Sequence, residues 1–280
     1  MRTFLFFAAA STLLFSGCAT RRASINNLPG YKLVWSDEFN KDGRPDSTKW
    51  TYEKGFVRNH ELQWYQPDNA RCEKGLLIIE AKREQRPNPN YEANSQDWRK
   101  NRATIDYTSS CLITRGLHQW QYGRFEMRGR IDVSPGMWPA WWALGVNKRW
   151  PANGEIDMME YYRGMLLANF VHLGENGKQK WYTVTKKLEE LGDASWATKF
   201  HTWRMDWDAD SLALYVDDIL LNKVMQADLT NRDGSNFKPF QQPQYMLLNL
   251  ALGGDNGGTP NDATFPHRFE VDYVRVYQQQ

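Results

Sequence analysis

The stretch Trp150-Pro-Ala-Asn-Gly-Glu-Ile-Asp-Met-Met-Glu-Tyr-Tyr162 places three carboxylates within six residues, among isoleucine and methionine. A strand points residues i and i+2 to the same face, so Glu155 and Asp157 would face the same way. Glu160 comes five residues after Glu155 and would face the opposite side of a regular strand. A β-bulge at one of the two methionines would return Glu160 to the acidic face, and bulges recur beside active sites. The spacing therefore predicts a bulged strand with three acids on one face.

Three like charges on one face repel each other, so we expect at least one acid to hold a proton at neutral pH. A protonated carboxyl beside an ionised one is the pair that hydrolyses glycosidic bonds. The alternative is a solvated strand edge whose acids alternate with core residues by accident. The three acids alone leave both interpretations open.

Composition bounds the class of protein. The chain has 280 residues, with 35 Lys and Arg against 33 Asp and Glu, and this near-neutral balance argues against a nucleic-acid partner. The 13 Trp, 13 Tyr and 13 Phe can pack a core or form flat platforms for sugars, and composition does not separate the two uses. The five scattered histidines argue against a transition-metal site, and the motifs of other common hydrolases and nucleotide-binding proteins are missing from the sequence.

The first 17 residues have a charged start and an apolar run, which predicts a signal peptide too short to span a membrane. Phe15-Ser-Gly-Cys18 resembles a bacterial lipobox, so Cys18 would carry the lipid and residues 18–27 would form a polar tether. Ala19 is not the Asp of an inner-membrane retention signal, which favours the outer membrane of a bacterial cell envelope. The alternative is an ordinary signal peptide with an incidental Cys. One domain would then cover residues 28–280, a length that suits a single all-β domain.

Beyond the tether, short runs rich in β-branched and aromatic residues alternate with turn residues. This pattern predicts an all-β fold of antiparallel sheets packed face to face as a sandwich. Asp217-Asp218 would form a hairpin turn, residues 186–191 a short helix, and residues 85–102 a surface loop beside a cleft. The predicted strands cover residues 31–35, 75–81, 122–131, 138–144, 154–161, 167–172, 201–207, 211–216, 245–251 and 269–277.

Two clusters near the acids favour sugar binding. Strand alternation would put Trp138 and Trp142 on one face and Trp141 on the other, where a core position is expected. Trp150 lies where a sugar ring could stack beside the cleaved bond. Asn59-His-Glu-Leu-Gln63 mixes amides with an imidazole, and amides suit sugar hydroxyls, although a lone Asn is more often a turn residue.

Glu155-Ile-Asp157-Met-Met-Glu160 resembles the E-[ILV]-D-x-x-E signature of glycoside hydrolase family 16, in its laminarinase-like, bulged-strand branch. The resemblance implies a β-jelly-roll of two curved antiparallel sheets with an open concave substrate cleft. It also implies endo-acting hydrolysis with retention of anomeric configuration. Six further blocks match in family order, at residues 33–39, 122–128, 138–142, 201–207, 248–254 and 271–277.

The resemblance also assigns roles. Glu155 would be the nucleophile, Glu160 the general acid and then the base, and Asp157 the residue that orients Glu155. No cofactor is required for catalysis. Stacking on sugars is implied for Trp138, Trp142 and Trp150, hydrogen bonding to sugars for Asn59 and Arg128, and a site histidine for His172. Glu38 and Asp272 stand where many relatives hold a structural calcium, an ion that prefers such oxygen ligands.

The substrate remains a choice among saccharides. A β-1,3-glucan of laminarin type is the best match. An endo-β-1,4-galactosidase acting on N-acetyllactosamine-containing glycans, such as mucin O-glycans or keratan, is the alternative, because residues 163–169 lack the His-Gly-rich run of many laminarinases. A non-catalytic glycan-binding lipoprotein would have no need of all three acids. We expect a monomer, and Cys72 and Cys111 could pair as a disulfide or remain buried thiols.

Overall fold

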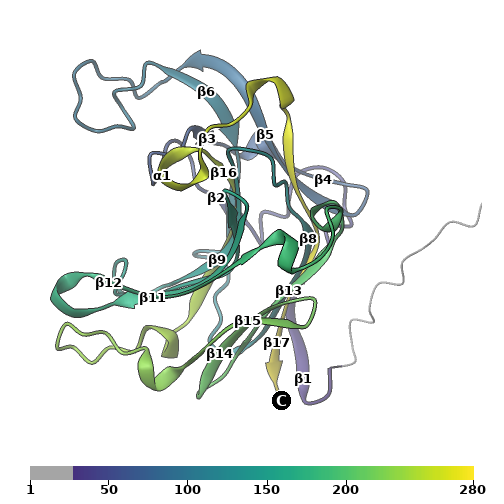
Figure 1. Ribbon diagram of the computed structural model, residues 1–280, viewed down its shortest axis with the longest axis vertical. Coiled ribbons are helices and arrows are strands. Elements are labelled where there is room, and N and C mark those ends of the chain that lie inside the picture. The colour runs from purple at the N-terminus through teal and green to yellow at the C-terminus, as the bar shows by residue number, and fades with distance from the viewer. Residues whose placement is uncertain (1–27) are drawn as a thin grey trace, which may run out of the picture.

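The structure, a computed structural model, describes residues 28–280, and these form two curved β-sheets packed face to face (Figure 1). The described residues contain one α-helix, α1 (Gly254–Gly257), in addition to short 3-10 turns. The predicted all-β sandwich is therefore confirmed. The 3-10 turns are Pro67–Asn69, Glu175–Gly177, Leu188–Glu190, Trp196–Thr198, Gln226–Asp228, Pro239–Gln241 and Asp262–Thr264.

One sheet, here called the cleft sheet, carries the acidic strand. Its order is β12-β11-β10-β9-β16-β7-β2, and all its pairings are antiparallel. Its strands are β2 (Thr51–Tyr52), β7 (Cys111–Ile113), β9 (Met137–Gly145), β10 (Glu155–Tyr162), β11 (Met165–Leu173), β12 (Gln179–Lys187) and β16 (Gln244–Leu252).

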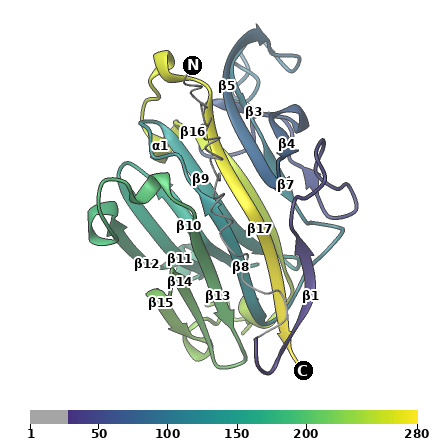
Figure 2. The same cartoon turned by 90° about the vertical axis from the view of Figure 1, so that its right-hand side faces the viewer.

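The second sheet, here called the outer sheet, has the order β15-β14-β13-β8-β17-β5-β6-β3, with β1 paired to β17 and β4 paired to β5. Figure 2 shows the long strand β17 running through this sheet, with β1 alongside it. Its strands are β1 (Tyr31–Asp37), β3 (Gln63–Tyr65), β4 (Ala70–Glu73), β5 (Leu76–Pro87), β6 (Thr104–Ser109), β8 (Gly123–Arg130), β13 (His201–Trp207), β14 (Ser211–Val216), β15 (Ile219–Met225) and β17 (His267–Gln279).

The core lies between the two sheets, and strand alternation builds it. Along β8, Phe125 and Met127 are buried, while Arg124, Glu126 and Arg128 beside them are only partly covered. From the cleft sheet, Trp141 and Ile156 point into the same core and are fully buried. Removing these apolar side chains from water is the main favourable term in folding. The opposite face of the cleft sheet is thereby left for the acids.

Most predicted elements are confirmed, and two local predictions are wrong. Asp217 and Asp218 both have positive φ, 47° and 67°, and join β14 to β15 as the expected tight hairpin. The helix predicted at residues 186–191 is instead the end of β12 followed by a single 3-10 turn, because pairing with β11 extends through Lys187. The disulfide alternative is also wrong, since Cys72 in β4 and Cys111 in β7 are buried free thiols in different sheets.

The predicted signal peptide, the lipidated Cys18 and its tether lie outside the described residues. Among residues 28–280, no helix is both long and apolar enough to cross a membrane.

Candidate active site

The acidic strand β10 contains the bulge that the sequence predicts. Against β11, Asp157 pairs with Asn169 and Glu160 pairs with Leu167, so Met158 and Met159 on β10 lie opposite Ala168 alone on β11. The pairing with β9 shifts between Asp157 and Met159 in the same way. This extra residue turns Glu160 onto the face that carries Asp157, and the two intervening methionines are fully buried beneath the sheet.

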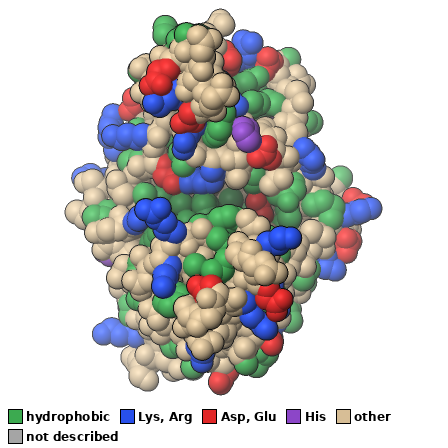
Figure 3. Space-filling view, turned by 90° about the vertical axis from the view of Figure 1, so that its left-hand side faces the viewer, with side chains coloured by type: hydrophobic (Ala, Val, Ile, Leu, Met, Phe, Trp, Pro, Cys, Tyr) green, Lys and Arg blue, Asp and Glu red, His purple; other side chains and the backbone are tan. Residues whose placement is uncertain are grey.

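All three acids line one open cleft of about 550 Å³ on the exposed face of the cleft sheet. Figure 3 shows this face hollowed, with hydrophobic side chains in the hollow and Lys and Arg side chains around it. The walls come from five strands, from the loop before β3 and from α1. The lining includes Arg58, Asn59, Glu61, Trp138, Trp142, Trp150, Glu155, Asp157, Glu160, Tyr162, Asn169, Trp181, Thr183, Asn249 and Asn256.

Two tryptophan indoles donate hydrogen bonds to Glu155 and Glu160. The Trp150 Nε1 donates to Glu155 Oε2 at 2.8 Å, and the Trp138 Nε1 donates to Glu160 Oε1 at 2.8 Å. Trp150 is 45% exposed, so its ring remains available to stack on a sugar, as the sequence predicts. Each indole therefore orients one carboxyl while its ring borders the cleft.

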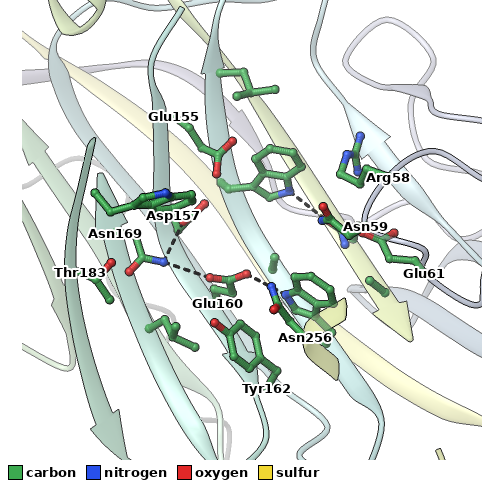
Figure 4. Close-up of a pocket in the computed structure, with 18 of the residues that line it drawn as sticks. Arg58, Asn59, Glu61, Glu155, Asp157, Glu160, Tyr162, Asn169, Thr183 and Asn256 are labelled. Atoms are coloured by element: carbon green, nitrogen blue, oxygen red, sulfur yellow. Dashed lines mark hydrogen bonds between the residues drawn. The ribbon is translucent and has the colours of Figure 1, made fainter. Parts of the chain in front are cut away.

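One amide donates to both Asp157 and Glu160. Asn169 Nδ2 donates to Asp157 Oδ2 at 2.9 Å and to Glu160 Oε2 at 3.0 Å (Figure 4). Because a primary amide nitrogen carries two hydrogens, one can go to each carboxylate. Sequence reasoning missed Asn169, although it lies directly opposite Asp157 once the β10–β11 register is known.

The three carboxyls share an environment that opposes charge. Burial raises the pKa of Asp157 to about 7 and, together with the charge of Asp157, raises the pKa of Glu160 to about 8. Burial and the charges of the other two acids raise the pKa of Glu155 well above its ordinary value. In the part of the chain that the structure describes, no lysine, arginine or histidine forms an ion pair with any of them. The cluster therefore retains protons near neutral pH.

Two nearby charged residues act differently on the pKa values of Glu155 and Glu160. The positive charge of Arg58 lowers the pKa of Glu155, whereas the negative charge of Glu61 adds to the rise in the pKa of Glu160. Glu61 is itself buried and its carboxylate accepts hydrogen bonds from Gln63 at 2.6 Å and Asn59 at 3.2 Å. Arg58 therefore acts on Glu155 in the direction that a nucleophile needs, and Glu61 acts on Glu160 in the direction that a general acid needs, while burial and the neighbouring acids keep the pKa of both groups raised.

The loop that carries Arg58 to Glu61 is held from outside the cleft. Arg102 donates to the backbone carbonyls of His60 and Glu61 at 2.9 and 2.8 Å, and its guanidinium lies 4.9 Å from the Trp98 ring. Trp98 and Arg102 belong to the surface loop predicted beside the cleft. That loop therefore supports the cleft wall.

Trp142 forms the middle of the cleft floor. Its Nε1 donates to Asn249 Oδ1 at 2.7 Å, and Asn249 Nδ2 donates to the Tyr65 hydroxyl at 3.0 Å. The Arg58 guanidinium lies 5.0 Å from the Trp142 ring. The predicted placement of Trp138 and Trp142 on the cleft face, with Trp141 in the core, is confirmed.

Known proteins resemble this chain in sequence and fold. The family model for Glycosyl hydrolases family 16 matches residues 68–275, which is most of the described chain. The chain belongs to glycosyl hydrolase family 16. Similarity to laminarinases supports the laminarinase-like branch of this family.

Three similar proteins illustrate the range of similarity. A β-glucanase of Rhodothermus marinus is 36% identical over 267 residues, which cover 90% of this chain and 87% of that protein. The laminarinase catalytic domain of Thermotoga maritima is 32% identical, covering 89% of this chain and 99% of its own, with a TM-score of 0.74. A structure from work on human gut bacteria whose endo-acting O-glycanases initiate mucin breakdown is 37% identical, covering 90% and 93%, with a TM-score of 0.82.

This family 16 protein is therefore a glycoside hydrolase, and its catalysis needs no cofactor. Two residues assigned to the site by resemblance lie elsewhere. Arg128 is on the outer sheet, where its guanidinium pairs with Asp272 at 2.8 Å. His172 is fully buried on the core side of β11 and stacks on Tyr182, because alternation points Asn169 into the cleft and turns His172 away.

The proposed calcium ligands also do not fit a cation. Both Glu38 oxygens accept hydrogen bonds from Arg275 at 2.8 Å, and Asp272 is paired with Arg128. An arginine already balances each carboxylate, so neither offers a free charge to a metal. Within residues 28–280, no three His, Cys, Asp or Glu side chains gather as a metal site.

Proposed function

We propose that the protein is a retaining endo-β-glycosidase that hydrolyses internal linkages of a β-1,3-glucan of laminarin type. The observation that carries the proposal is the bulged strand β10, which places three acids without cationic partners between Trp138, Trp142 and Trp150 in an open cleft. An open cleft suits a chain that enters sideways and is cut internally. Similarity to a β-glucanase and a laminarinase supports a glucan as the substrate.

In the first step, the Glu155 carboxylate attacks the anomeric carbon as the bond to the leaving oxygen breaks. Glu160 gives its proton to that oxygen, and a glycosyl–enzyme ester on Glu155 results. The Trp150 indole orients the nucleophile, and the Trp138 indole and Asn169 amide orient the acid. The raised pKa of Glu160 keeps its proton available near neutral pH.

In the second step, Glu160 takes a proton from water, and the water oxygen attacks the anomeric carbon while the ester bond to Glu155 breaks. Two displacements restore the original β-configuration. Asp157 lies between the two acids and, with its own raised pKa, can hold a proton toward Glu155 while that carboxylate changes charge. Its place on the strand, two residues after Glu155, fits this orienting role.

A second candidate is an endo-β-1,4-galactosidase that acts on N-acetyllactosamine-containing glycans. Two observations favour it. The gut bacterial O-glycanase structure superposes with a TM-score of 0.82, compared with 0.74 for the Thermotoga maritima laminarinase. The residues that depart from the laminarinase pattern, 163–169, form the turn and strand that bring Asn169 to the acids.

A substrate screen separates the two candidates. Wild-type protein is incubated with laminarin, mixed-linkage glucan, agarose, keratan and mucin, and the products are identified by mass spectrometry. Laminarin ladders with no product from keratan or mucin support the glucan proposal. Products from mucin or keratan alone overturn it in favour of the galactosidase. Glu155→Gln is the control, because any product that this variant still releases does not come from the proposed site.

We also propose that Cys18 anchors the protein, as a monomer, to the outer membrane of a bacterial cell envelope. The lipobox-like Phe15-Ser-Gly-Cys18 and the absence of Asp at position 19 support this localisation. Radiolabelled palmitate should be incorporated into the wild type and not into Cys18→Ala, which should leave the membrane fraction. A labelled Cys18→Ala variant, or an unlabelled wild type, would contradict the anchor.

A further inference from the structure

Asn169 makes contacts that the proposed steps use but do not explain. It lies on β11 opposite Asp157, is 3% exposed, and directs its amide nitrogen at two of the three acids. Figure 4 shows this nitrogen between Asp157 and Glu160, with the amide oxygen on the side away from them. The bulge in β10 makes this double contact available, because it brings Glu160 to the face already occupied by Asp157.

The same side chain carries a cost to the fold. Asn169 Oδ1 is sealed from solvent and has no hydrogen-bond partner among the described residues. An unpaired buried acceptor destabilises the folded state, and an apolar side chain of similar size would avoid that penalty. Stability alone therefore does not account for an amide at this position, and a catalytic task is one reason for which such an unpaired group is retained.

The geometry around Glu160 indicates that task. Both carboxyl oxygens accept an N–H bond, Oε1 from Trp138 and Oε2 from Asn169, so the group is held from two sides. The proton that leaves for the sugar must then occupy a remaining lone pair. The second Asn169 hydrogen holds Asp157 apart as a separate acceptor. A carboxyl fixed in this way transfers its proton from one defined position.

We propose that Asn169 is a positioning residue that fixes the Glu160 carboxyl for proton transfer and keeps Asp157 from sharing the Glu160 proton. The proposal rests on the proposed function, because it takes Glu160 as the general acid. The two N–H bonds of Asn169 also lower the pKa of Asp157 and of Glu160, which opposes the effect of burial. Removing the amide should therefore raise both pKa values and loosen Glu160.

The test compares wild type with Asn169→Ala and Asn169→Leu. We expect kcat/KM to fall about 100-fold, as misplacement of a reacting group can cause. We also expect the alkaline limb of its pH profile to move upward, because a Glu160 with a higher pKa stays protonated to higher pH. The melting temperature of Asn169→Leu should change little, since removal of the unpaired oxygen offsets the loss of the two N–H bonds.

Asn222 provides a matched control on β15. It is a buried asparagine whose Nδ2 also makes two hydrogen bonds, to the backbone carbonyls of Ala168 at 2.8 Å and Tyr182 at 2.9 Å. Asn222→Leu should lower the melting temperature without moving the alkaline limb. If Asn169→Leu behaves in the same way, Asn169 is a structural residue and the proposal fails.

A measurement without substrate separates this proposal from the proposed function. Carbon-13 NMR titration of the Glu160 carboxyl in wild type and Asn169→Ala needs no turnover. A higher Glu160 pKa in the variant supports the positioning role even if no glucan or galactan is cleaved. An unchanged Glu160 pKa overturns it even if laminarin proves to be the substrate.

Discussion

The acidic residues of the two sheets lie in opposite electrostatic environments. On the outer sheet, carboxylates of β13, of β17 and of the residue after β1 lie against arginines, which balance their charge. The pairs are Arg124 with Asp206, Arg128 with Asp272, Arg130 with Glu270, and Arg275 with Glu38. On the cleft sheet, Glu155, Asp157 and Glu160 face only neutral N–H donors within hydrogen-bonding distance.

This contrast separates carboxylates that stabilise the fold from carboxylates that can take part in catalysis. A carboxylate that an arginine balances stays ionised and has no proton to exchange near neutral pH. A buried carboxylate with no cation keeps a raised pKa, which is a mark of functional sites. The same strand alternation builds both arrangements, so the presence or absence of an arginine on the neighbouring strand decides between them. Four predictions test the contrast.

The largest effect is expected on the cleft sheet. Glu155→Gln and Glu160→Gln should each lower kcat/KM by about 10⁴-fold, because one loses the nucleophile and the other the general acid. Release of reducing ends from the cleaved polysaccharide measures the loss. Asp206→Asn on the outer sheet is the control and should retain activity within about twofold, since Asp206 pairs with Arg124 and does not line the cleft. Substantial activity in either glutamine variant would contradict the assignment.

The next effect is on stability of the outer sheet. Arg275 is 1% exposed, so Glu38→Gln leaves a buried guanidinium without its counter-charge. We expect the free energy of unfolding to fall by about 3 kcal/mol, measured by urea denaturation, with kcat unchanged. Asp68→Asn breaks the exposed pair with Arg44 and should cost less than about 1 kcal/mol. Equal losses in the two variants would mean that burial of the pair does not matter.

Asp157→Asn should have the reverse effect on stability. The pKa of Asp157 rises from an ordinary 3.8 to about 7 on folding, so its stabilising contribution is complete below pH 4 and is lost as pH rises through 7. The neutral amide lacks this loss. We therefore expect the variant to be more stable than wild type by a few kcal/mol at pH 8, since each unit of the pKa rise corresponds to about 1.4 kcal/mol, with little difference at pH 4. A stability difference that is independent of pH would contradict the raised pKa.

The smallest effect concerns the cleft wall. Burial first, and then the charge of Asp157, raise the pKa of Glu160, and Glu61 adds a smaller rise. Glu61→Gln should therefore move the alkaline limb of kcat/KM to lower pH, by less than about one unit. Asn169→Ala is expected to move it the other way. Shifts in the same direction in the two variants would show that they act through the fold rather than on Glu160.

The acidic strand is predictable from the sequence because its three acids lie within six residues. With side chains that alternate between faces, few arrangements bring all three to one face. Trp138, Trp142 and Trp141 follow from the same alternation. Strand β12 is missed because most of its side chains are polar or exposed, which hides the strand period. The sequence therefore predicts a helix at Lys187, whereas Lys187 is the last residue of strand β12.

The wrong site residues have a common cause. Arg128 and His172 are assigned by their position in a family pattern, without asking which face of the strand each occupies. His172 is three residues from Asn169, so alternation places the two on opposite faces. Asn169 itself could be found only by counting register across the bulge, which single-strand patterns do not give. The arginines that balance Glu38 and Asp272 are equally invisible before the strands are paired.

The roles of Glu155 and Glu160 are tested by trapping the glycosyl–enzyme intermediate and locating the residue that carries it. An activated 2-deoxy-2-fluoro-β-glycoside of the cleaved saccharide is incubated with wild-type protein, and the peptide that spans β10 is sequenced by mass spectrometry. We expect a single label on Glu155, because Glu155 is the nucleophile and Glu160 the acid. A label on Asp157 or Glu160, or a product of inverted configuration with no label, would contradict these roles.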